Sequence, residues 1–216
     1  SGDPDLSARL ARALEVDPGA GLDRWTHGFH TYAARMHPDT AGRLVRAFSR
    51  AGDTVLDPFC GSGTVIVEAL VAGSKPLGRD LNPVAVRLAG IRAAIVPESR
   101  RRLVREHARR AAGIAIGRVR QGHEPPEPAP PGADQFDSRT FAELRWLLAV
   151  VNAERDPFVR DALEVVLSSI LVKLSRRTSD TDARYQPRCR PAGGAASIFT
   201  HKVDELSRRW KFLREA

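Results

Sequence analysis

A glycine-rich string follows a short apolar run and has the composition of a ligand-binding turn; it reads Asp57-Pro58-Phe59-Cys60-Gly61-Ser62-Gly63-Thr64. The run before it, Thr54-Val55-Leu56, predicts a buried strand, and the apolar residues after it predict a helix. Glycine lets the backbone approach a ligand where a side chain would collide, and the first turn of a helix offers unpaired N–H groups to an anion. The string therefore predicts a site for an anionic group between a strand and a helix.

A second acidic residue stands where the next predicted strand ends. The segment Pro76-Leu77-Gly78-Arg79-Asp80 predicts that strand, and its last residue follows Gly61 by about 20 positions. At this separation a carboxylate typically accepts hydrogen bonds from a ribose diol. The two strand ends together predict adenosine as part of the ligand.

Other kinds of glycine-rich site fit these residues less well. A triphosphate-binding loop needs Gly-Lys-Ser/Thr after the glycines, and none follows. A nicotinamide dinucleotide site needs a third glycine where Ile66 stands. A turn that only packs a helix on a strand remains an alternative, but the full string with an acid at the second strand end is much rarer than a lone Gly-x-Gly. A nucleoside ligand is the favoured interpretation.

The same residues resemble a known family. The segment Leu56 to Thr64 resembles motif I of amino-group methyltransferases acting on DNA bases, and a similar form occurs in some RNA guanine methyltransferases. Gly78 to Pro83 resembles the motif that follows, and His27 to Met36 is similar to the HxYxAK/R segment of DNA modification methylases. The resemblance covers residues 27–96 and implies an α/β, Rossmann-like methyltransferase fold with S-adenosyl-L-methionine as cofactor.

The resemblance also implies a role for individual residues. Asp57 would lie near the amino group of the cofactor's methionine, and Gly61 and Gly63 would lie beneath the cofactor. Asp80 would hold the ribose, with Tyr32 beside it. The complete predicted cofactor site consists of His30, Thr31, Tyr32, Asp57, Pro58, Phe59, Cys60, Gly61, Ser62, Gly63, Thr64, Asp80, and Leu81 and Asn82, which would flank the adenine.

A second motif of that family is absent from the sequence. Methyl transfer to an exocyclic amine depends there on [Asp/Asn/Ser]-Pro-Pro-[Tyr/Phe/Trp], whose polar groups hold the amine while the ring stacks on a flipped base. Glu124-Pro125-Pro126-Glu127 has the prolines without the ring, so the catalytic residues stay unknown. Two predicted strands are also too few for a doubly wound sheet, so the predicted fold is incomplete. We therefore expect a fragment of a longer enzyme, or one half of a split enzyme whose sheet and active site a second polypeptide completes.

Helical patterns dominate the rest of the chain. We predict N-terminal helices and a cofactor-binding β-α-β core over residues 1–97, followed by a largely helical region over residues 98–216 with a Pro-rich linker at 122–133. Apolar residues at helical spacing predict helices at 6–14, 38–50, 63–72, 82–94, 98–120, 141–151, 158–174 and 197–213. Three aromatic residues lie on apolar helix faces and are predicted to be core residues: Trp146, Phe158 and Trp210.

The formal net charge of +8 favours a polyanionic partner, because each phosphate that a cation neutralises releases condensed counterions. Nucleic acid is the predicted partner, and the segment around His30-Thr31-Tyr32 favours DNA over RNA. An arginine-rich, solvated surface is the alternative. A cluster of cations around one aromatic residue suits a nucleic-acid backbone and an unstacked base, although a solvated loop explains it equally well; it comprises Arg176, Arg177, Arg184, Tyr185 and Arg188.

Metal, thiol and membrane chemistry find little support in the sequence. His27, His30 and His37 have no carboxylate or thiolate at ligand spacing, so no metal is predicted. The two cysteines, Cys60 and Cys189, are predicted to be reduced, with the first a small buried hydrophobe. No apolar run is long enough to cross a bilayer and the first residues lack a secretion signal, so a cytoplasmic location is expected.

The leading hypothesis is the cofactor-binding portion of a methyltransferase that acts on exocyclic amino groups of DNA bases. Its chemistry would be direct displacement at a sulfonium, with proximity and orientation providing most of the rate. An RNA guanine methyltransferase is the closest alternative enzyme. A non-catalytic subunit that binds S-adenosylmethionine or nucleic acid is the alternative from another class.

Overall fold

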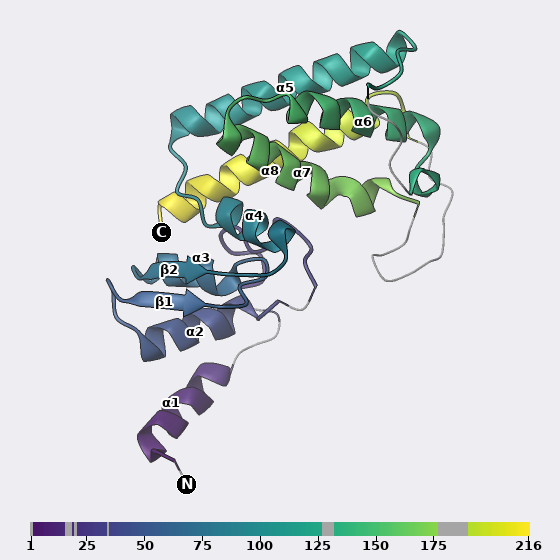
Figure 1. Cartoon of the computed structure of the whole chain (residues 1–216). Coiled ribbons are helices and arrows are strands. Elements are labelled where there is room, and N and C mark those ends of the chain that lie inside the picture. The colour runs from purple at the N-terminus through teal and green to yellow at the C-terminus, as the bar shows by residue number, and fades with distance from the viewer. Residues whose placement is uncertain (1, 16–18, 20, 34, 127–131, 177–189) are drawn as a thin grey trace. The chain divides into compact units, whose positions relative to one another are not determined.

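The computed structural model describes residues 2–15, 19, 21–33, 35–126, 132–176 and 190–216, and statements about structure refer to these residues (Figure 1). The chain divides into two compact units. Unit 1 comprises Ser1–Val96 and Arg209–Ala216, and unit 2 comprises Pro97–Arg208. Each unit is described by itself.

Unit 1 alternates helices and strands in the order expected from the sequence. Prolines stand in the first turn of its helices α1, α2 and α4, where a missing N–H costs nothing. Asn82 begins α4 by accepting a hydrogen bond from Val84 N at 3.0 Å, and His37 Nδ1 begins α2 by accepting from Asp39 N at 3.2 Å. The elements are α1 (Pro4–Leu14), α2 (Pro38–Phe48), β1 (Thr54–Asp57), α3 (Thr64–Val71), β2 (Lys75–Gly78) and α4 (Pro83–Arg92).

The two strands pair in parallel, with Leu56 opposite Leu77 and Asp57 opposite Gly78. Helix α3 connects them and packs against both. The covered face of β2 needs a glycine, because a Cβ at Gly78 would lie 3.0 Å from Ile66 Cδ1 and 3.1 Å from Cys60 Sγ. Side chains alternate across a strand, so the leucines lie on the opposite face. There Leu56 is 55% exposed and Leu77 is 48% exposed.

This sheet differs from the parallel sheets of complete α/β domains. Parallel sheets are normally covered on both faces, and their strands are correspondingly apolar. Here the described part of the chain covers one face and leaves the leucine face open to solvent. Unit 1 is thus a mixed helical unit around a two-stranded parallel sheet, as expected for part of a larger sheet.

Gly63 brings the start of α3 against α4. Its φ of +81° lies in the left-handed region, and a Cβ there would lie 2.8 Å from Ala89 Cβ and 2.9 Å from Ala89 Cα. Both the backbone conformation and the contact exclude a side chain at this position. One of the two glycines in the Gly-x-Gly string therefore serves helix packing.

Substitution of this glycine tests the close approach. Gly63→Ala should lower the free energy of unfolding by about 2–4 kcal/mol, since left-handed strain and overpacking add. Gly90→Ala is the matched control on α4, because a Cβ at this exposed position meets nothing within 4 Å. It should raise stability by about 0.5–1 kcal/mol through helix propensity. Urea unfolding of both variants checks this, and equal stability of Gly63→Ala and wild type would contradict the packing role.

Unit 2 is helical. Its long basic helix buries several alanines, including Ala108 and Ala112, and packs against the next two long helices of the chain. Small side chains allow this close approach. The predicted linker ends in a short 3-10 turn, and its residues 127–131 lie outside the described part of the chain. The elements are α5 (Glu98–Arg120), η1 (Ala133–Gln135), α6 (Ser138–Asn152), α7 (Pro157–Leu174) and α8 (Gly194–Arg214), whose residues from Arg209 onward belong to unit 1.

A buried carboxylate on α6 satisfies the start of α8. Glu143 is 1% exposed and accepts hydrogen bonds from Gly193 N at 2.6 Å, Ala195 N at 2.9 Å and Ala196 N at 3.3 Å. These are the N–H groups that the first turn of a helix leaves unpaired. The negative charge also complements the positive end of the helix dipole. The charge of Glu143 is therefore compensated by these backbone N–H groups.

The predicted core aromatics divide into two kinds. Trp210 is fully buried and its Nε1 donates to Ile91 O at 2.8 Å, as a buried indole requires. Trp146 and Phe158 are only half-buried, so their prediction as core residues was wrong. Arg118 lies over the Trp146 ring at 5.4 Å and Arg100 over the Phe158 ring at 5.4 Å. Cation–π contacts at the surface replace the apolar burial that helical spacing suggested.

Candidate cofactor site

Backbone hydrogen bonds fasten the glycine-rich turn to the carboxyl end of β2. Arg79 N donates to Asp57 O at 2.9 Å, and Cys60 N donates to Arg79 O at 2.8 Å. Next along the chain, Gly61 N donates to Asp80 Oδ2 at 2.8 Å. The two acidic strand ends predicted from the sequence therefore lie at the same edge of the sheet, and the second is bonded directly to the turn.

Both oxygens of the Asp80 carboxylate accept hydrogen bonds from the backbone. Oδ1 accepts from Asn82 N at 2.9 Å. These backbone N–H groups, from Asn82 first and Gly61 next, lower the pKa of Asp80 below its ordinary value. The side chain stays ionised at neutral pH and is half-exposed. Each carboxylate oxygen can accept a further hydrogen bond, so a diol could bind here.

Tyr32 is distant in sequence from Asp80 but lies beside two residues of the site, Asn82 and Gly61. Asn82 Nδ2 donates to Tyr32 Oη at 3.3 Å. A Cβ at Gly61 would lie 3.5 Å from Tyr32 Cε1, so the ring flanks the glycine. The structure thus brings together four of the predicted residues, Tyr32, Gly61, Asp80 and Asn82, in a cluster that we call the Asp80 cluster.

Two buried hydroxyls at the start of α3 have no partner within the described residues. Ser62 is 2% exposed and Thr64 is 4% exposed, and neither side-chain oxygen forms a hydrogen bond there. Buried hydroxyl groups in folded proteins nearly always have a partner, so these two require one that the described residues do not supply. Helix α3 adds its positive N-terminal end. A carboxylate fits this donor set.

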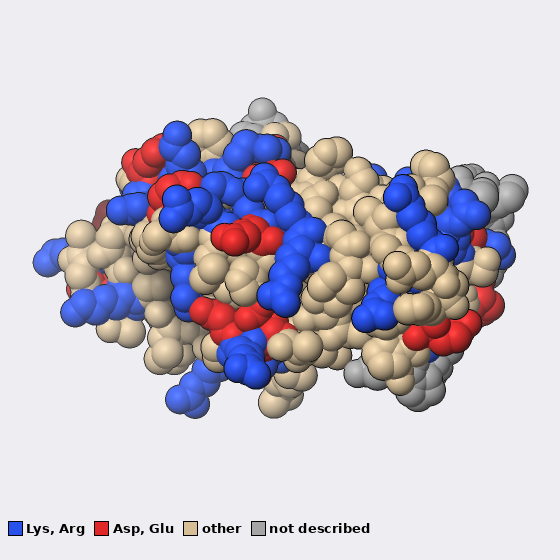
Figure 2. Space-filling model, turned by 90° about the horizontal axis from the view of Figure 1, so that it is seen from above, with Lys and Arg blue, Asp and Glu red and all other residues tan. Residues whose placement is uncertain are grey.

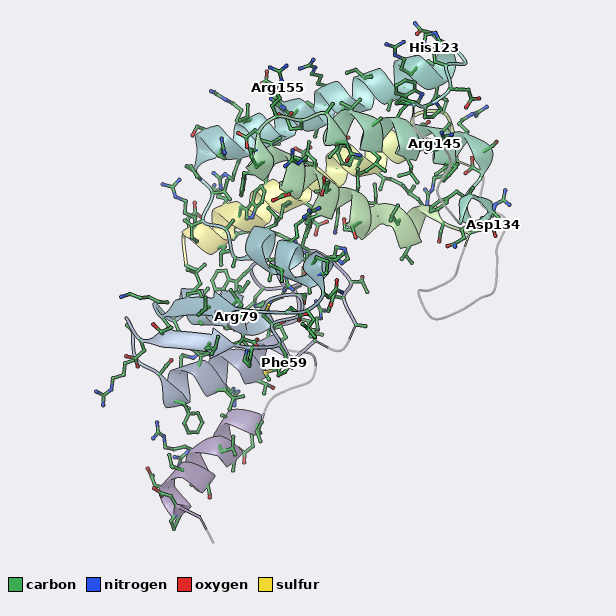
Figure 3. All side chains as sticks on the ribbon, viewed as in Figure 1. Phe59, Arg79, His123, Asp134, Arg145 and Arg155 are labelled. Carbon is green, nitrogen blue, oxygen red and sulfur yellow. The ribbon has the colours of Figure 1, made fainter. Side chains whose placement is uncertain are left out.

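The remaining predicted site residues lie closer to the surface. Asp57 Oδ1 accepts from Phe59 N at 3.1 Å and so turns the chain after β1. His30 Nδ1 donates to the carbonyl of Thr31 at 2.8 Å. The Phe59 side chain, labelled in Figure 3, is 81% exposed and Leu81 is 97% exposed. Pro58 and Thr31 are also exposed. These side chains offer apolar surface beside the Asp80 cluster without being fixed by it.

Cys60 is a core residue of the turn, as the sequence predicted. It is 6% exposed and packs in a small cluster with Ile66 and Ala89. Burial raises the pKa of its thiol, and the nearby charges of Asp57 and Asp80 raise it further. The thiol therefore stays protonated at neutral pH and is a poor nucleophile.

Three buried polar side chains, Arg92, His27 and Glu68, form a hydrogen-bonded chain that contacts the turn. We call them the Arg92 relay. Arg92 and His27 are 0% exposed and Glu68 is 1% exposed. Arg92 Nη2 lies 3.0 Å from His27 Nδ1, and His27 Nε2 lies 2.8 Å from Glu68 Oε1. A guanidinium only donates, so Nδ1 must accept and the proton must sit on Nε2, where it is donated to the carboxylate. Neutral His27 thereby connects a buried cation to a buried anion.

The Arg92 guanidinium also binds two backbone carbonyls. Nη1 donates to Ser62 O at 2.5 Å and Nε donates to Thr26 O at 3.1 Å, while Thr26 Oγ1 donates back to Arg92 O at 2.9 Å. Burial lowers the pKa of Arg92 to about 9, which leaves it charged at neutral pH. One side chain on α4 therefore holds both the glycine-rich turn and the segment that leads to Tyr32.

Sequence reasoning missed the Arg92 relay. Its signal was a charged residue inside an otherwise apolar helix, since Glu68 interrupts the α3 sequence TVIVEALV. A charge in such a position is normally buried only with a partner. That partner, His27, precedes it by 41 residues and could not be identified from spacing.

The relay predicts a pH dependence of stability. Burial is the main cause that lowers the pKa of His27 from 6.5, although its hydrogen bond to Glu68 opposes the shift. The unfolded chain then binds a proton more readily than the folded one, so the free energy of unfolding should fall as pH drops below about 6.5. The fall attributable to this residue should reach up to about 1.4 kcal/mol per pH unit.

Urea titrations of wild type and His27→Gln between pH 5 and 8 measure this effect. The variant should be less stable at pH 8 and show a flatter profile below about pH 6.5. His201→Gln is the control, because that ring is exposed on α8, and it should keep the wild-type profile. Identical pH profiles for His27→Gln and wild type would show that the buried ring does not contribute to the pH dependence of stability.

Metal and membrane features are absent from the part of the chain that the structure describes. No group of three or more His, Cys, Asp or Glu side chains there could hold a metal ion. Within the same residues, no helix has the length and apolarity that crossing a bilayer demands.

The predicted nucleic-acid residues are only partly described. Arg176 is half-buried and its backbone N donates to Gln135 O at 2.7 Å. The other four, Arg177, Arg184, Tyr185 and Arg188, lie outside the described residues. Figure 2 shows basic side chains spread over the face that carries α5, with acidic side chains among them. Mixed charges of this kind are typical of a solvated surface.

Comparison with known proteins agrees with the geometry. A family described as DNA methylase matches residues 18–90, the stretch that contains α2, both strands and most of α4. This segment is therefore similar to the DNA methylase family. The family match lies within unit 1 and contains the Asp80 cluster, His27 and Glu68.

Three curated relatives resemble parts of this chain. A type II methyltransferase of Methanocaldococcus jannaschii is 30% identical over 66 residues, 31% of this chain and 12% of the relative. A type II methyltransferase of Kocuria varians is 31% identical over 78 residues, 35% of this chain and 17% of the relative. A tRNA (guanine(10)-N2)-dimethyltransferase of Methanothermobacter thermautotrophicus is 38% identical over 52 residues, 24% of this chain and 16% of the relative. The chain thus spans less than a fifth of each of these relatives, and no solved structure matches it.

Proposed function

We propose that this chain is the cofactor-binding portion of an S-adenosylmethionine-dependent methyltransferase that acts on exocyclic amino groups of DNA bases. The observation that carries the proposal is the Asp80 cluster, in which an ionised carboxylate is bonded to the glycine-rich turn beside Tyr32. The match of residues 18–90 to the DNA methylase family supports it. The two-stranded sheet then corresponds to part of a Rossmann-like methyltransferase fold.

The residues present suit S-adenosylmethionine. Asp80 would accept hydrogen bonds from the ribose hydroxyls, and Leu81 offers exposed apolar surface to the adenine. The cofactor carries both an amino group and a carboxylate on its methionine end. Asp57 would attract the amino group. The carboxylate would lie at the start of α3, where the hydroxyls of Ser62 and Thr64 have no partner among the described residues.

The protein's main task in such a site is to orient the reactants. The cofactor supplies a methyl group on a positively charged sulfur, which makes it susceptible to displacement by an amine. The chain's part is orientation, because a methyl donor fixed in line with the incoming amine removes most of the entropic barrier. The Arg92 relay would hold the turn rigid for that purpose.

An RNA guanine methyltransferase is the second candidate function. The similarity to the tRNA dimethyltransferase supports it, since that relative is 38% identical over 52 residues of this chain. The two type II methyltransferases and the DNA methylase family favour DNA. A non-catalytic role in binding the cofactor or nucleic acid is the third, because the sequence has no Pro-Pro-aromatic motif.

Titration with S-adenosylmethionine tests the cofactor assignment. Asp80→Ala should bind at least about ten-fold more weakly than wild type, because hydrogen bonds to a charged group contribute about 1.5–3 kcal/mol. Asp80→Asn keeps one carbonyl oxygen for the backbone N–H groups and should bind with intermediate affinity. Isothermal calorimetry gives the dissociation constants.

Glu106→Ala is the matched control for this titration, since Glu106 is an exposed carboxylate in the middle of α5. It should bind the cofactor as wild type does. Thermal unfolding of each variant without cofactor separates loss of binding from loss of fold. Equal affinity of folded Asp80→Ala and wild type would remove this residue from the site.

We also propose that a further segment or a partner polypeptide completes the active site. Leu56 and Leu77 expose the face that a complete parallel sheet would cover, and the described strands have no third neighbour. The sequence lacks the motif that would hold a flipped base. The added polypeptide would supply both.

A transfer assay tests this second part. The 216-residue chain with labelled S-adenosylmethionine and duplex DNA should bind cofactor weakly and transfer no methyl groups. Addition of a polypeptide that carries a Pro-Pro-aromatic motif of this family should produce methylated bases. Parallel reactions with tRNA distinguish the RNA alternative. Robust methylation of DNA by the chain alone would contradict the need for a partner.

A further inference from the structure

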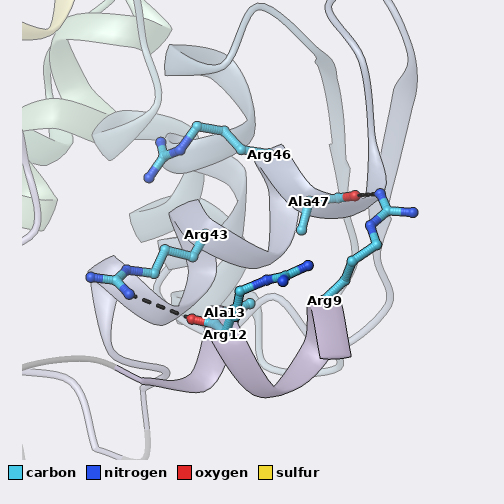
Figure 4. Close-up of a pocket in the computed structure, with 6 residues that line it drawn as sticks. All are labelled: Arg9, Arg12, Ala13, Arg43, Arg46 and Ala47. Carbon is cyan, nitrogen blue, oxygen red and sulfur yellow. Dashed lines mark hydrogen bonds between the residues drawn. The ribbon is translucent and has the colours of Figure 1, made fainter. Parts of the chain in front are cut away.

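A pocket of about 340 Å³ lies between α1 and α2 in unit 1. Its lining consists of Arg9, Arg12, Ala13, Arg43, Arg46 and Ala47 (Figure 4). Four of the six lining residues carry a permanent positive charge, and none is acidic. Like charges gathered in this way repel one another, so the arrangement favours an anion between them.

Two of the arginines, Arg9 and Arg43, connect the ends of α1 and α2. Arg9 Nη2 on α1 donates to Ala47 O at the end of α2, and Arg43 Nη1 on α2 donates to Glu15 O at 2.5 Å just after the end of α1. Each helix thus satisfies a carbonyl that the end of the other leaves unpaired. Arg9 also lies over the Phe48 ring at 5.2 Å. These contacts fix two of the pocket's cations.

The other two arginines are available to a ligand. The Arg12 guanidinium has no hydrogen bond or ion pair with any described residue and is exposed. Arg46 is also exposed, and its nearest carboxylate is buried Glu68, with Nη1 and Oε2 3.9 Å apart. A guanidinium has five donors, so Arg9 and Arg43 each keep further N–H groups for an anion.

We propose that this pocket, the α1–α2 arginine pocket, binds a phosphodiester of the nucleic-acid backbone. Arg12 and Arg46 contact the phosphate oxygens, and Arg9 and Arg43 contribute charge and spare N–H groups. Guanidinium groups match phosphate oxygens in paired hydrogen bonds. A volume of about 340 Å³ accommodates a phosphate together with part of its sugars. Such an interaction positions a nucleic acid without reading its sequence.

The choice of DNA as the polyanion rests on the proposed function, whereas the anion site rests on the geometry of α1 and α2 alone. Arg46 lies 3.9 Å from Glu68 of the Arg92 relay, whereas Arg12 has no ion pair or hydrogen bond with the Asp80 cluster or that relay. The pocket would therefore contribute to substrate binding and leave cofactor binding unaffected.

Binding of a fluorescent duplex DNA to the 216-residue chain, measured by anisotropy over a range of salt concentrations, tests the pocket. Arg12→Gln should bind about two- to five-fold more weakly at physiological salt. Its plot of log affinity against log salt should be less steep by about 0.9, because the variant neutralises one phosphate fewer than wild type does. Arg12→Gln/Arg46→Gln should show roughly twice that change in slope.

Arg214→Gln is the matched control, because it removes the same charge from an exposed position in unit 1 outside the pocket. It should keep the wild-type salt dependence. Equal behaviour of Arg12→Gln and Arg214→Gln, or the absence of any DNA binding by wild type, would overturn the proposal. Displacement of the DNA by poly-glutamate as effectively as by unlabelled DNA at equal charge would assign the pocket to an acidic protein and also overturn it.

The same proteins titrated with S-adenosylmethionine separate the two proposals. Retained cofactor binding with unchanged DNA binding in Arg12→Gln would remove the pocket and leave the proposed function standing. If wild type does not bind the cofactor but Arg12→Gln still lowers the salt dependence of DNA binding, the proposed function is removed and the pocket stands.

Discussion

A guanidinium that is fully out of water must find a partner for its charge and for its donors, and much of unit 1 is organised around that requirement. Arg92 lies at the end of α4, and its N–H groups reach the backbone of the turn after β1, the backbone of the segment before Tyr32, and the ring of His27. The carboxylate that balances the charge, Glu68, lies on α3. Four segments are held by one cation, so its removal would leave several buried carbonyls unpaired and His27 without its donor.

The neutral imidazole of His27 makes this arrangement possible. It accepts from a donor-only group on one nitrogen and donates to an acceptor-only group on the other, which no other side chain does with two atoms on one rigid ring. A direct Arg–Glu pair would have drawn α3 and α4 together at one point. The inserted ring leaves room for Gly63 to set the distance between these helices through its contact with Ala89. The glycine-rich turn is held by both contacts.

Local features of the structure could be predicted from sequence, and long-range pairings could not. Asp80 and Gly61 belong to a βαβ unit whose chain length fixes where its strands end, so spacing alone brought them to one edge. The strands, the four helices of unit 1 and the four long helices of unit 2 follow from apolar period and proline position in the same way. Glu68 and His27 are paired by tertiary folding, and no periodicity encodes a partner 41 residues away. Helical spacing likewise indicates which face of a helix is apolar but not how deeply it is covered, which is why Trp210 is buried while Trp146 is not.

The open leucine face favours association between copies of this chain. Two short parallel strands with unpaired edges and exposed leucines offer a template for adding strands from any neighbour, including another copy. The formal charge of +8 opposes that encounter, because like-charged molecules repel over about one Debye length, roughly 8 Å at physiological ionic strength. Salt weakens this repulsion and leaves the apolar attraction intact. The colloidal stability of the chain is therefore tied to ionic strength, and a polyanion that neutralises its arginines would also bring the exposed sheets of separate molecules within reach of each other.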